Sequence, residues 1–125
     1  MIAALDHLVL TTEHEETCIA FYTGLLGMEL QSFGAGRRAF RFGDQKINLH
    51  LKGREFEPKA RIPQPGALDL CLLAAIPLEE VIARLHAAGM TIEEGPVART
   101  GARGPIRSVY LRDPDGNLIE ISSYG

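Results

Sequence analysis

Hydrophobic residues follow two periods along this chain of 125 residues, and the two periods alternate in the same order twice. A short stretch in which apolar and polar residues alternate is typical of a half-buried strand, and one such stretch opens each half. A stretch with apolar residues three or four positions apart follows, which is typical of an amphipathic helix. Three more strand patterns close each half. The chain is therefore predicted to be an α+β protein with two βαβββ modules, at about 1–57 and about 66–125, in a single domain spanning 1–125.

The first module is predicted to begin with a strand at 5–10 and a helix directly after it. Thr12 and Glu15 have the spacing of a capping box, which satisfies free N–H groups at a helix start, and Gly27 suits the left-handed turn that ends a helix. The apolar stripe of this helix consists of Cys18, Ile19, Tyr22, Leu25 and Leu26. Three short strands are predicted at 28–33, 38–42 and 46–51. The glycine-rich run between the first two of these leads into a strand, so it predicts a hairpin turn and not a dinucleotide-binding loop.

A polar connector rich in proline precedes the second module, which repeats the order of the first. A strand at 67–73 leads to a helix whose first position suits Pro77. The apolar stripe of this helix consists of Leu78, Val81, Ile82 and Leu85. Strands are predicted at 90–94, 107–111 and 117–122, and the last two are joined by a turn. The segment 95–104 is rich in glycine and predicts a mobile loop.

The repeat has a register that can be read from the sequence. Superposition of the two modules places Leu8 on Leu70 at the opening strands and Leu49 on Ile119 at the closing strands. The second module is longer between these two points, and its additional residues fall in the predicted loop. A shared element order and matched strand ends together indicate a duplicated unit.

One ionisable residue interrupts the hydrophobic run of each opening and closing strand. These residues are His7 and His50 in the first module and Asp69 and Glu120 in the second. A charged carboxylate among apolar neighbours is costly unless it is paired or binds a cation. Taken singly, each histidine is more often a satisfied or half-exposed residue than a ligand, and each acid has an ordinary structural use as a loop cap or a surface ion pair. Because the repeat relates the four positions, together they predict a site for a divalent transition metal.

Composition and charge limit the partners of the chain. The net charge is −3, so no basic excess favours nucleic acid. No apolar run approaches the roughly 20 residues of a membrane span, and the N-terminus lacks the basic start of a signal peptide. A cytoplasmic protein that binds neither nucleic acid nor membrane is therefore expected. Residues 37–61 hold eight bases and three acids, which indicates either a solvated face or a cationic rim that attracts an anionic small molecule.

The other cysteines and histidines are assigned structural or solvent roles. Cys18 and Cys71 stand in apolar contexts and are predicted to be reduced core residues rather than nucleophiles. His14 and His86 fall on predicted helices among charged neighbours, and they are expected to face solvent.

Three stretches of the chain resemble the vicinal oxygen chelate superfamily, which includes glyoxalases, bleomycin-resistance proteins and extradiol dioxygenases. They are Leu5-Asp6-His7-Leu8-Val9-Leu10, Phe21-Tyr22-Thr23-Gly24-Leu25-Leu26-Gly27-Met28 and Asp113-Pro114-Asp115-Gly116-Asn117-Leu118-Ile119-Glu120. The stretches 42–46, 55–60, 77–80 and 93–97 are more narrowly similar to the subgroup of glyoxalase-domain-containing protein 5. The resemblance covers essentially the whole chain.

This resemblance implies a fold, a metal and a dimer. Paired βαβββ modules of this superfamily form an incomplete eight-stranded barrel around a divalent metal, usually in a homodimer. His7 and Glu120 match the family's ligands on the opening and closing strands. The glyoxalase pattern adds a carboxylate at the place of His50 and an imidazole at the place of Asp69, so the two residue types are exchanged here. His50 would then replace the imidazole, with Asp69 as a fourth ligand or a base, and the metal would be Zn, Ni, Fe or Mn.

The predicted function follows from this ligand set. A metal-dependent enzyme of the glyoxalase type, an isomerase or lyase, would stabilise an enediolate of a substrate with two neighbouring oxygens. Glu120 or Asp69 would move protons. Arg99, Thr100 and Arg103 would bind the substrate from a closing loop. Two alternatives stay open. His7, His50 and Glu120 have the composition of the facial triad of an Fe(II) dioxygenase, and a metal-free protein of the resistance type would only bind a small molecule.

Overall fold

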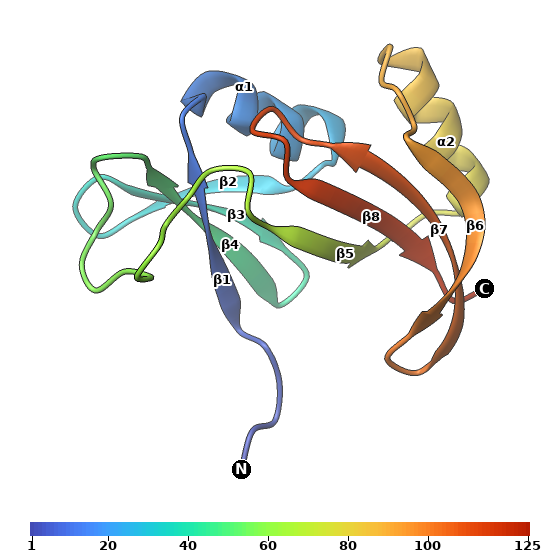
Figure 1. Cartoon of the computed structure of the whole chain (residues 1–125), viewed down its shortest axis with the longest axis horizontal. Coiled ribbons are helices and arrows are strands. Elements are labelled where there is room, and N and C mark those ends of the chain that lie inside the picture. The colour runs from blue at the N-terminus through green and yellow to red at the C-terminus, as the bar shows by residue number, and fades with distance from the viewer. The chain divides into compact units, whose positions relative to one another are not determined.

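The element order βαβββ occurs twice in the structure, as the hydrophobic pattern predicts. The computed structural model describes all 125 residues, which divide into unit 1, Met1–Ala67, and unit 2, Leu68–Gly125. Unit 1 contains β1 (His7–Thr12), α1 (Glu15–Ile19), its π-helical continuation η1 (Ala20–Leu25), β2 (Glu29–Phe33), β3 (Arg37–Phe42) and β4 (Gln45–Leu51) (Figure 1). Unit 2 contains β5 (Asp69–Leu73), α2 (Leu78–Ala87), β6 (Glu94–Gly101), β7 (Gly104–Arg112) and β8 (Leu118–Ser123).

Each unit forms one four-stranded sheet, and the two sheets have the same topology. The strand orders are β1-β4-β3-β2 and β5-β8-β7-β6. In each sheet the first strand pairs in parallel with the last one, and the remaining pairs are antiparallel. The predicted α+β class with two βαβββ modules is therefore confirmed.

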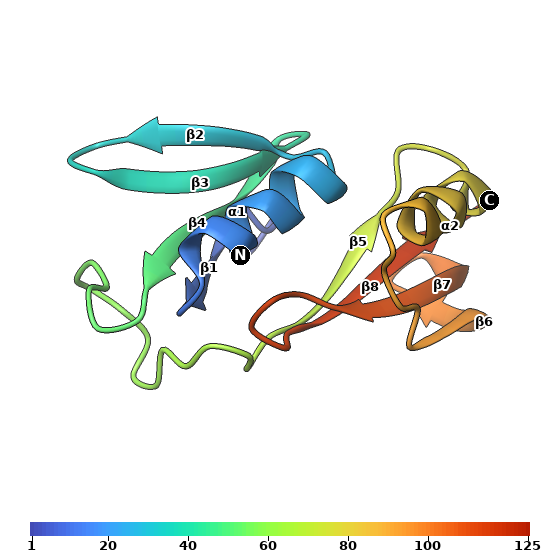
Figure 2. The same ribbon diagram turned by 90° about the horizontal axis from the view of Figure 1, so that it is seen from above.

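In unit 1 the helical segment covers one face of the sheet (Figure 2). The Tyr22 ring stacks on Phe40 of β3 with their centroids 5.1 Å apart, and both side chains are fully buried. Leu10 of β1 and Ile47 of β4 are buried on the same face, because alternate strand residues point to the same side. Burial of these side chains supplies the main stabilisation of unit 1.

In unit 2 helix α2 packs along β7 and β8. Leu78, Val81 and Leu85 of the predicted stripe are buried, and Ile82 is half-buried. They pack on the face that carries the buried side chains Val109, Leu111, Ile119 and Ile121. The sequence pattern is thus confirmed for this helix, although Pro77 directly precedes its first turn and is not part of it.

Helix α1 begins later than the sequence predicts. Thr12 is the last residue of β1, and its hydroxyl accepts a hydrogen bond from the His14 N–H at 2.9 Å. His14 precedes the first helical residue and provides no side-chain cap. The helix therefore starts at Glu15, later than the Thr12 signal predicts, because the strand retains the threonine.

The segment 95–104 is not a loop, so that prediction is also wrong. It forms most of β6 and the turn to β7, and the two strands make an antiparallel hairpin from Val97 to Ser108 with an irregularity between Glu94 and Val97. A side chain at Gly95 would collide with the Ser108 carbonyl oxygen, so this close approach requires glycine. The predicted strand at 90–94 is correspondingly displaced, since β6 begins only at its last residue.

The strand pairing corrects the register of the repeat at the closing strands. Leu8 of β1 pairs with Ile47 of β4, and its counterpart Leu70 of β5 pairs with Ile119 of β8. Ile47, and not Leu49, is therefore the counterpart of Ile119. The same correction places Asn48, rather than His50, at the position of Glu120. A two-residue slip keeps every side chain on its face, so hydrophobic alternation alone could not reveal it.

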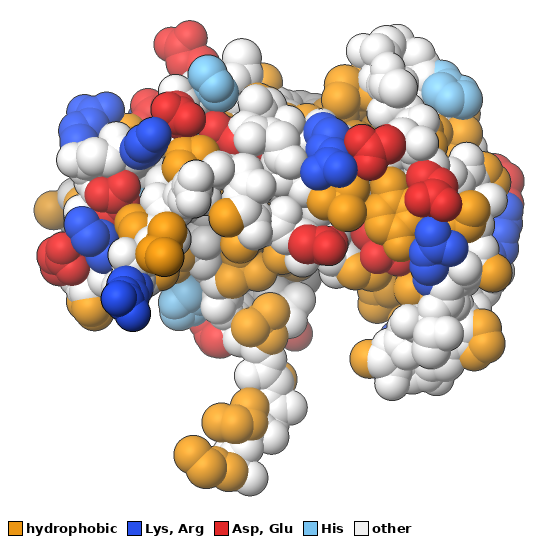
Figure 3. All heavy atoms as spheres, viewed as in Figure 1, with side chains coloured by type: hydrophobic (Ala, Val, Ile, Leu, Met, Phe, Trp, Pro, Cys, Tyr) orange, Lys and Arg blue, Asp and Glu red, His pale blue; other side chains and the backbone are white.

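The segment at the N-terminus lies outside the sheet of unit 1. The segment before β1 extends away from its sheet (Figure 1) and carries exposed hydrophobic side chains, among them Met1, Ile2 and Leu5 (Figure 3). None of the helices has the length and apolar character that crossing a membrane requires.

Cys18 is buried as predicted, whereas Cys71 is exposed, because it alternates with Leu70 and Leu72 and so points away from α2.

Candidate functional site

All four predicted ligands lie on the sheet faces that the helices do not cover. His7 and His50 alternate with the buried residues Leu10, Ile47 and Leu49. Asp69 and Glu120 likewise lie on the side of their sheet opposite Ile119 and Ile121. The period of two in strand side chains therefore assigns the candidates to one face in each unit.

His7 is exposed and has one ring nitrogen engaged. Its Nδ1 lies 2.7 Å from the Asp6 carboxylate. This hydrogen bond is the main reason why the pKa of Asp6 is lowered. A carboxylate that holds one nitrogen of an imidazole leaves the other free to bind a metal, and metal-binding histidines are commonly oriented in this way.

His50 is almost fully buried, and neither ring nitrogen has a hydrogen-bond partner. The imidazole and the Phe56 ring are in a T-shaped contact, with 5.6 Å between the ring centroids. Burial lowers the pKa of His50, and the positive charge of Arg37 lowers it further. The imidazole is therefore neutral at pH 7.

The structure does not bring the two histidines of unit 1 together. His50 is four residues beyond Lys46, the strand partner of His7, which corresponds to about 13 Å along the strand at roughly 3.3 Å per residue. Asn48, at the position that corresponds to Glu120, lies between them on β4. Its side chain is also buried, and its Oδ1 atom has no partner.

Glu120 is held by two buried serines that the sequence analysis did not single out. Ser108 Oγ donates to Glu120 Oε2 at 2.6 Å, and Ser122 Oγ lies 3.3 Å from the same oxygen and 2.7 Å from Ser108 Oγ. Both serines are fully buried. The sequence does not single out these serines, because both strands also carry other polar or charged residues. Only the pairing of β7 with β8 places both serines beside Glu120.

Two further groups share this face of unit 2. Cys71 Sγ lies 3.2 Å from Ser122 Oγ. Although the residue as a whole is exposed, partial desolvation of the thiol is the main reason why its pKa is raised. Asp69 is exposed and stands two residues before Cys71, which pairs with Glu120. Unit 2 therefore presents two carboxylates on one face, about 7 Å apart along the strand direction, and one of them is free of hydrogen bonds.

The three predicted substrate-binding residues belong to the β6–β7 hairpin. The Arg99 guanidinium donates to the Tyr110 hydroxyl at 3.0 Å and to Glu94 at 3.2 Å. The Arg103 guanidinium lies over the Tyr124 ring, 4.5 Å from its centroid. Thr100 is exposed and pairs with Pro105 across the hairpin. Both arginines are thus anchored within unit 2, and their contact with a substrate stays a prediction.

Neither unit gathers three or more His, Cys, Asp or Glu side chains into a group that could hold a metal ion. The ligand set of His7, His50, Asp69 and Glu120 is therefore not tested by the arrangement within the units.

A pocket of about 430 Å³ lies elsewhere in unit 1. Its lining residues are Glu15, Gly36, Arg38, Leu49, Leu51, Arg54 and Phe56. Arg38 and Leu49 are cross-strand partners on the helix-covered face, whereas Phe56, which also lines the pocket, contacts the ring of His50. Its size alone does not identify the site, because none of the candidate ligands lines it.

Comparison with known proteins identifies the family. The model of the Glyoxalase/Bleomycin resistance protein/Dioxygenase superfamily matches residues 4–121. The chain therefore belongs to this superfamily, as the sequence motifs indicate.

Individual relatives are similar over nearly the whole chain. Glyoxalase domain-containing protein RDO1 of Mycosarcoma maydis is 54% identical over 123 residues, which are 98% of this chain and 69% of the relative. The crystal structure of virulence protein STM3117 from Salmonella typhimurium is 52% identical, covers 100% of this chain and 99% of its own, and has a TM-score of 0.97. Lactoylglutathione lyase from Agrobacterium tumefaciens, 24% identical with a TM-score of 0.76 and covering 99% of this chain and 96% of its own, shares the fold.

Proposed function

We propose that this protein is a metal-dependent enzyme of the glyoxalase type, an isomerase or lyase that acts on a small molecule with two neighbouring oxygens. The observation that carries the proposal is the carboxylate of Glu120, which two buried serine hydroxyls hold on the open face of the second sheet. A rigid carboxylate supported by neighbouring hydroxyls is the usual preparation of a metal ligand. Membership of the superfamily supports the same interpretation.

The side chains have the chemistry of ligands for a divalent transition metal. His7 keeps one ring nitrogen free while Asp6 engages the other, and Glu120 has only one of its two oxygens in the serine contacts. Imidazole and carboxylate together suit Zn, Ni, Fe or Mn. We therefore propose His7, Glu120 and Asp69 as ligands, and we assign His50 a different role below.

The bound metal would act as a Lewis acid toward the oxygens of the substrate. Ser108 and Ser122 keep the Glu120 carboxylate in one orientation, so that it does not have to reorganise during the reaction. Asp69 is exposed and has no hydrogen-bond partner, so its carboxylate is able to accept a proton from a substrate carbon and return it.

We also propose a homodimer, as in other members of the superfamily, to be checked by sedimentation velocity.

Metal content tests this proposal. We expect the protein purified without chelator and without a nickel column to contain a stoichiometric divalent metal by elemental analysis. His7→Ala and Glu120→Ala should each lose most of it, since each removes one ligand whose neighbours remain in place.

The matched control is His86→Ala, which removes an exposed histidine of α2 and should leave the metal content unchanged. A cooperative thermal unfolding transition of each variant serves as the check that it is folded. An unchanged metal content in both His7→Ala and Glu120→Ala would contradict the proposal, as would a native protein without any stoichiometric metal.

Metal-free binding of a small molecule is the second candidate function. The observation that favours it is the set of buried polar atoms without partners on Asn48 and His50. A ligand could form hydrogen bonds with these atoms whether or not a metal is bound. A metal-free protein that binds its ligand with undiminished affinity would favour this candidate. The dioxygenase alternative has less support, because His7 and His50, the two imidazoles of its triad, are four residues apart in the strand register.

A further inference from the structure

Strand β4 buries three polar atoms for which unit 1 offers no hydrogen-bond partner. They are Asn48 Oδ1 and the two ring nitrogens of His50. The side chains are 6% and 3% exposed, respectively. Such atoms are rare in folded proteins because burial costs them their hydrogen bonds to water, so each one requires an explanation. Asn48 and His50 are two positions apart and point to the same face.

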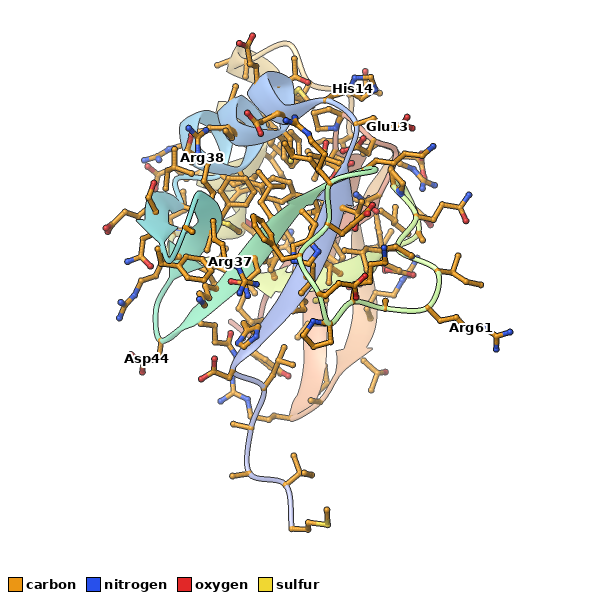
Figure 4. The ribbon with its side chains drawn as sticks, turned by 90° about the vertical axis from the view of Figure 1, so that its left-hand side faces the viewer. Glu13, His14, Arg37, Arg38, Asp44 and Arg61 are labelled. Carbon is orange, nitrogen blue, oxygen red and sulfur yellow. The ribbon has the colours of Figure 1, made fainter.

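The surroundings of these atoms are aromatic and positively charged. Arg38 pairs with Leu49, so Arg37 occupies the position beside His50 on the neighbouring strand. Its guanidinium lies over the Phe56 ring, 4.9 Å from the centroid, and over the Phe33 ring at 5.1 Å. Arg37 lies against the ribbon, whereas Arg61 extends away from it (Figure 4).

A second cation completes this surface. Lys46 Nζ is 3.8 Å from the centroid of Phe33. Neither Lys46 nor Arg37 forms an ion pair with an acidic side chain. Both side chains therefore keep their charge available to an anionic group.

The protonation state of His50 defines which partners the three atoms need. Arg37 and Glu55 are the charged groups that act on the imidazole, and burial together with Arg37 keeps it neutral. A neutral imidazole has one N–H donor and one nitrogen acceptor. With Asn48 Oδ1, the three atoms form one donor and two acceptors. Hydroxyl groups suit this set because each both donates and accepts a hydrogen bond.

We propose that Asn48 and His50 recognise the hydroxyl groups of a planar, hydroxylated anion, whose ring packs beside Phe56 and whose negative charge lies toward Arg37 and Lys46. This inference rests on the proposed small-molecule function and adds the class of ligand. Phe56 is in edge-to-face contact with the His50 ring, so a ligand that reaches the imidazole from this side must displace that contact. His50 is then a ligand-binding residue and not a metal ligand.

The probe is 3,4-dihydroxybenzoate, which has two neighbouring hydroxyls and a carboxylate on one ring, and benzoate is the matched compound without hydroxyls. Isothermal titration on the purified protein should show that 3,4-dihydroxybenzoate binds at least about tenfold more tightly than benzoate. His50→Phe and Asn48→Leu keep the size of the side chains and remove the polar atoms. Each should weaken binding of the hydroxylated compound about tenfold or more and should leave benzoate binding unchanged. His86→Phe is the control.

Thermal unfolding without ligand gives a second measurement that separates a binding role from a structural one. If the buried atoms lack partners in the free protein, His50→Phe should raise the unfolding temperature, since it removes two unsatisfied nitrogens. The proposal is overturned if the variant unfolds at lower temperature and binds the probe as tightly as the wild type. It is also overturned if hydroxyls add nothing to the affinity.

The outcome is independent of the proposed metal chemistry. His50→Phe should keep the metal content of the wild type, whereas His7→Ala and Glu120→Ala should lose it. If His7→Ala and Glu120→Ala keep their metal content while His50→Phe weakens probe binding, only the metalloenzyme proposal is contradicted. If those two variants lose metal while His50→Phe binds the probe as the wild type does, only the present proposal is contradicted.

Discussion

Buried polar side chains have opposite arrangements in the two units. Ser108 and Ser122 are fully buried, but each shares hydrogen bonds with the other and with Glu120. Asn48 and His50 are buried without such partners. A satisfied polar network fixes a side chain in place, whereas an unsatisfied one costs stability. This difference is the reason why we propose Glu120 as a metal ligand and His50 as a residue that binds a small molecule.

The pH dependence of stability checks the environment of His50. Its pKa lies below the ordinary value of 6.5 in the folded protein because of burial and Arg37. The contribution of neutral His50 to the free energy of unfolding has its full value above about pH 6.5. It declines as the pH falls toward the folded pKa, because the unfolded state then binds a proton that the folded state does not.

We therefore expect His50→Phe to lose less stability than the wild type between pH 7 and pH 5, in denaturant unfolding at each pH. His86→Phe should follow the wild type, since this histidine is exposed. Parallel curves for the wild type and His50→Phe would show that the pKa of His50 is the same in both states.

Two glycines within regular elements have opposite environments. Gly95 lies where β6 approaches β7, with φ +111° and with the Ser108 carbonyl in the space of a side chain. Gly24 lies in the π-helical segment with no atom within 4 Å of that space and an ordinary backbone angle. The first position requires glycine, and the second does not.

Alanine substitutions at these two positions should have opposite effects on the free energy of unfolding. Gly95→Ala should lower it by more than about 2 kcal/mol, because strain at this φ and the carbonyl contact add up. Gly24→Ala should raise it by roughly 0.5–1 kcal/mol through the lower entropy of the unfolded chain. Chemical denaturation measures both values, and equal effects of the two substitutions would contradict this account of the hairpin.

At the scale of the whole molecule, two units with separate cores are joined by an exposed connector. Residues 57–62 are exposed without interruption, and no strand or helix lies between β4 and β5. The two units have the same sheet topology, and each buries its own helix stripe. Chain segments of this kind are the preferred sites of proteolysis.

Limited digestion with trypsin should first cut the chain after Arg61, which extends away from the ribbon (Figure 4). Fragments 1–61 and 62–125 are expected by mass spectrometry, and Arg61→Gln should delay the cut. A first cut after Arg99 or Arg103 would instead indicate that the β6–β7 hairpin is mobile, as the glycine content of that segment suggests.

The sequence alone indicates the duplicated βαβββ order, every strand except the second-module strand at 94–101, and the placement of His7 and Glu120 on an opening and a closing strand. These conclusions follow from local periodicity and from family motifs, and each of these patterns lies within one continuous segment of the chain. The helix start at Glu15 and the strand at 94–101 were missed, because strand pairing outweighed the capping signal of Thr12 and the glycines of the hairpin.

Only the tertiary structure decided which residues are counterparts and which are neighbours. The observed strand register shows that Asn48, and not His50, occupies the position in unit 1 that corresponds to Glu120 in unit 2. Hydrophobic alternation cannot reveal a slip of two residues, because such a slip keeps each side chain on its face. The contacts of Ser108 with Glu120 and of Phe56 with His50 likewise join residues from separate elements. Such contacts depend on strand register and chain reversal, which are set by packing among distant segments.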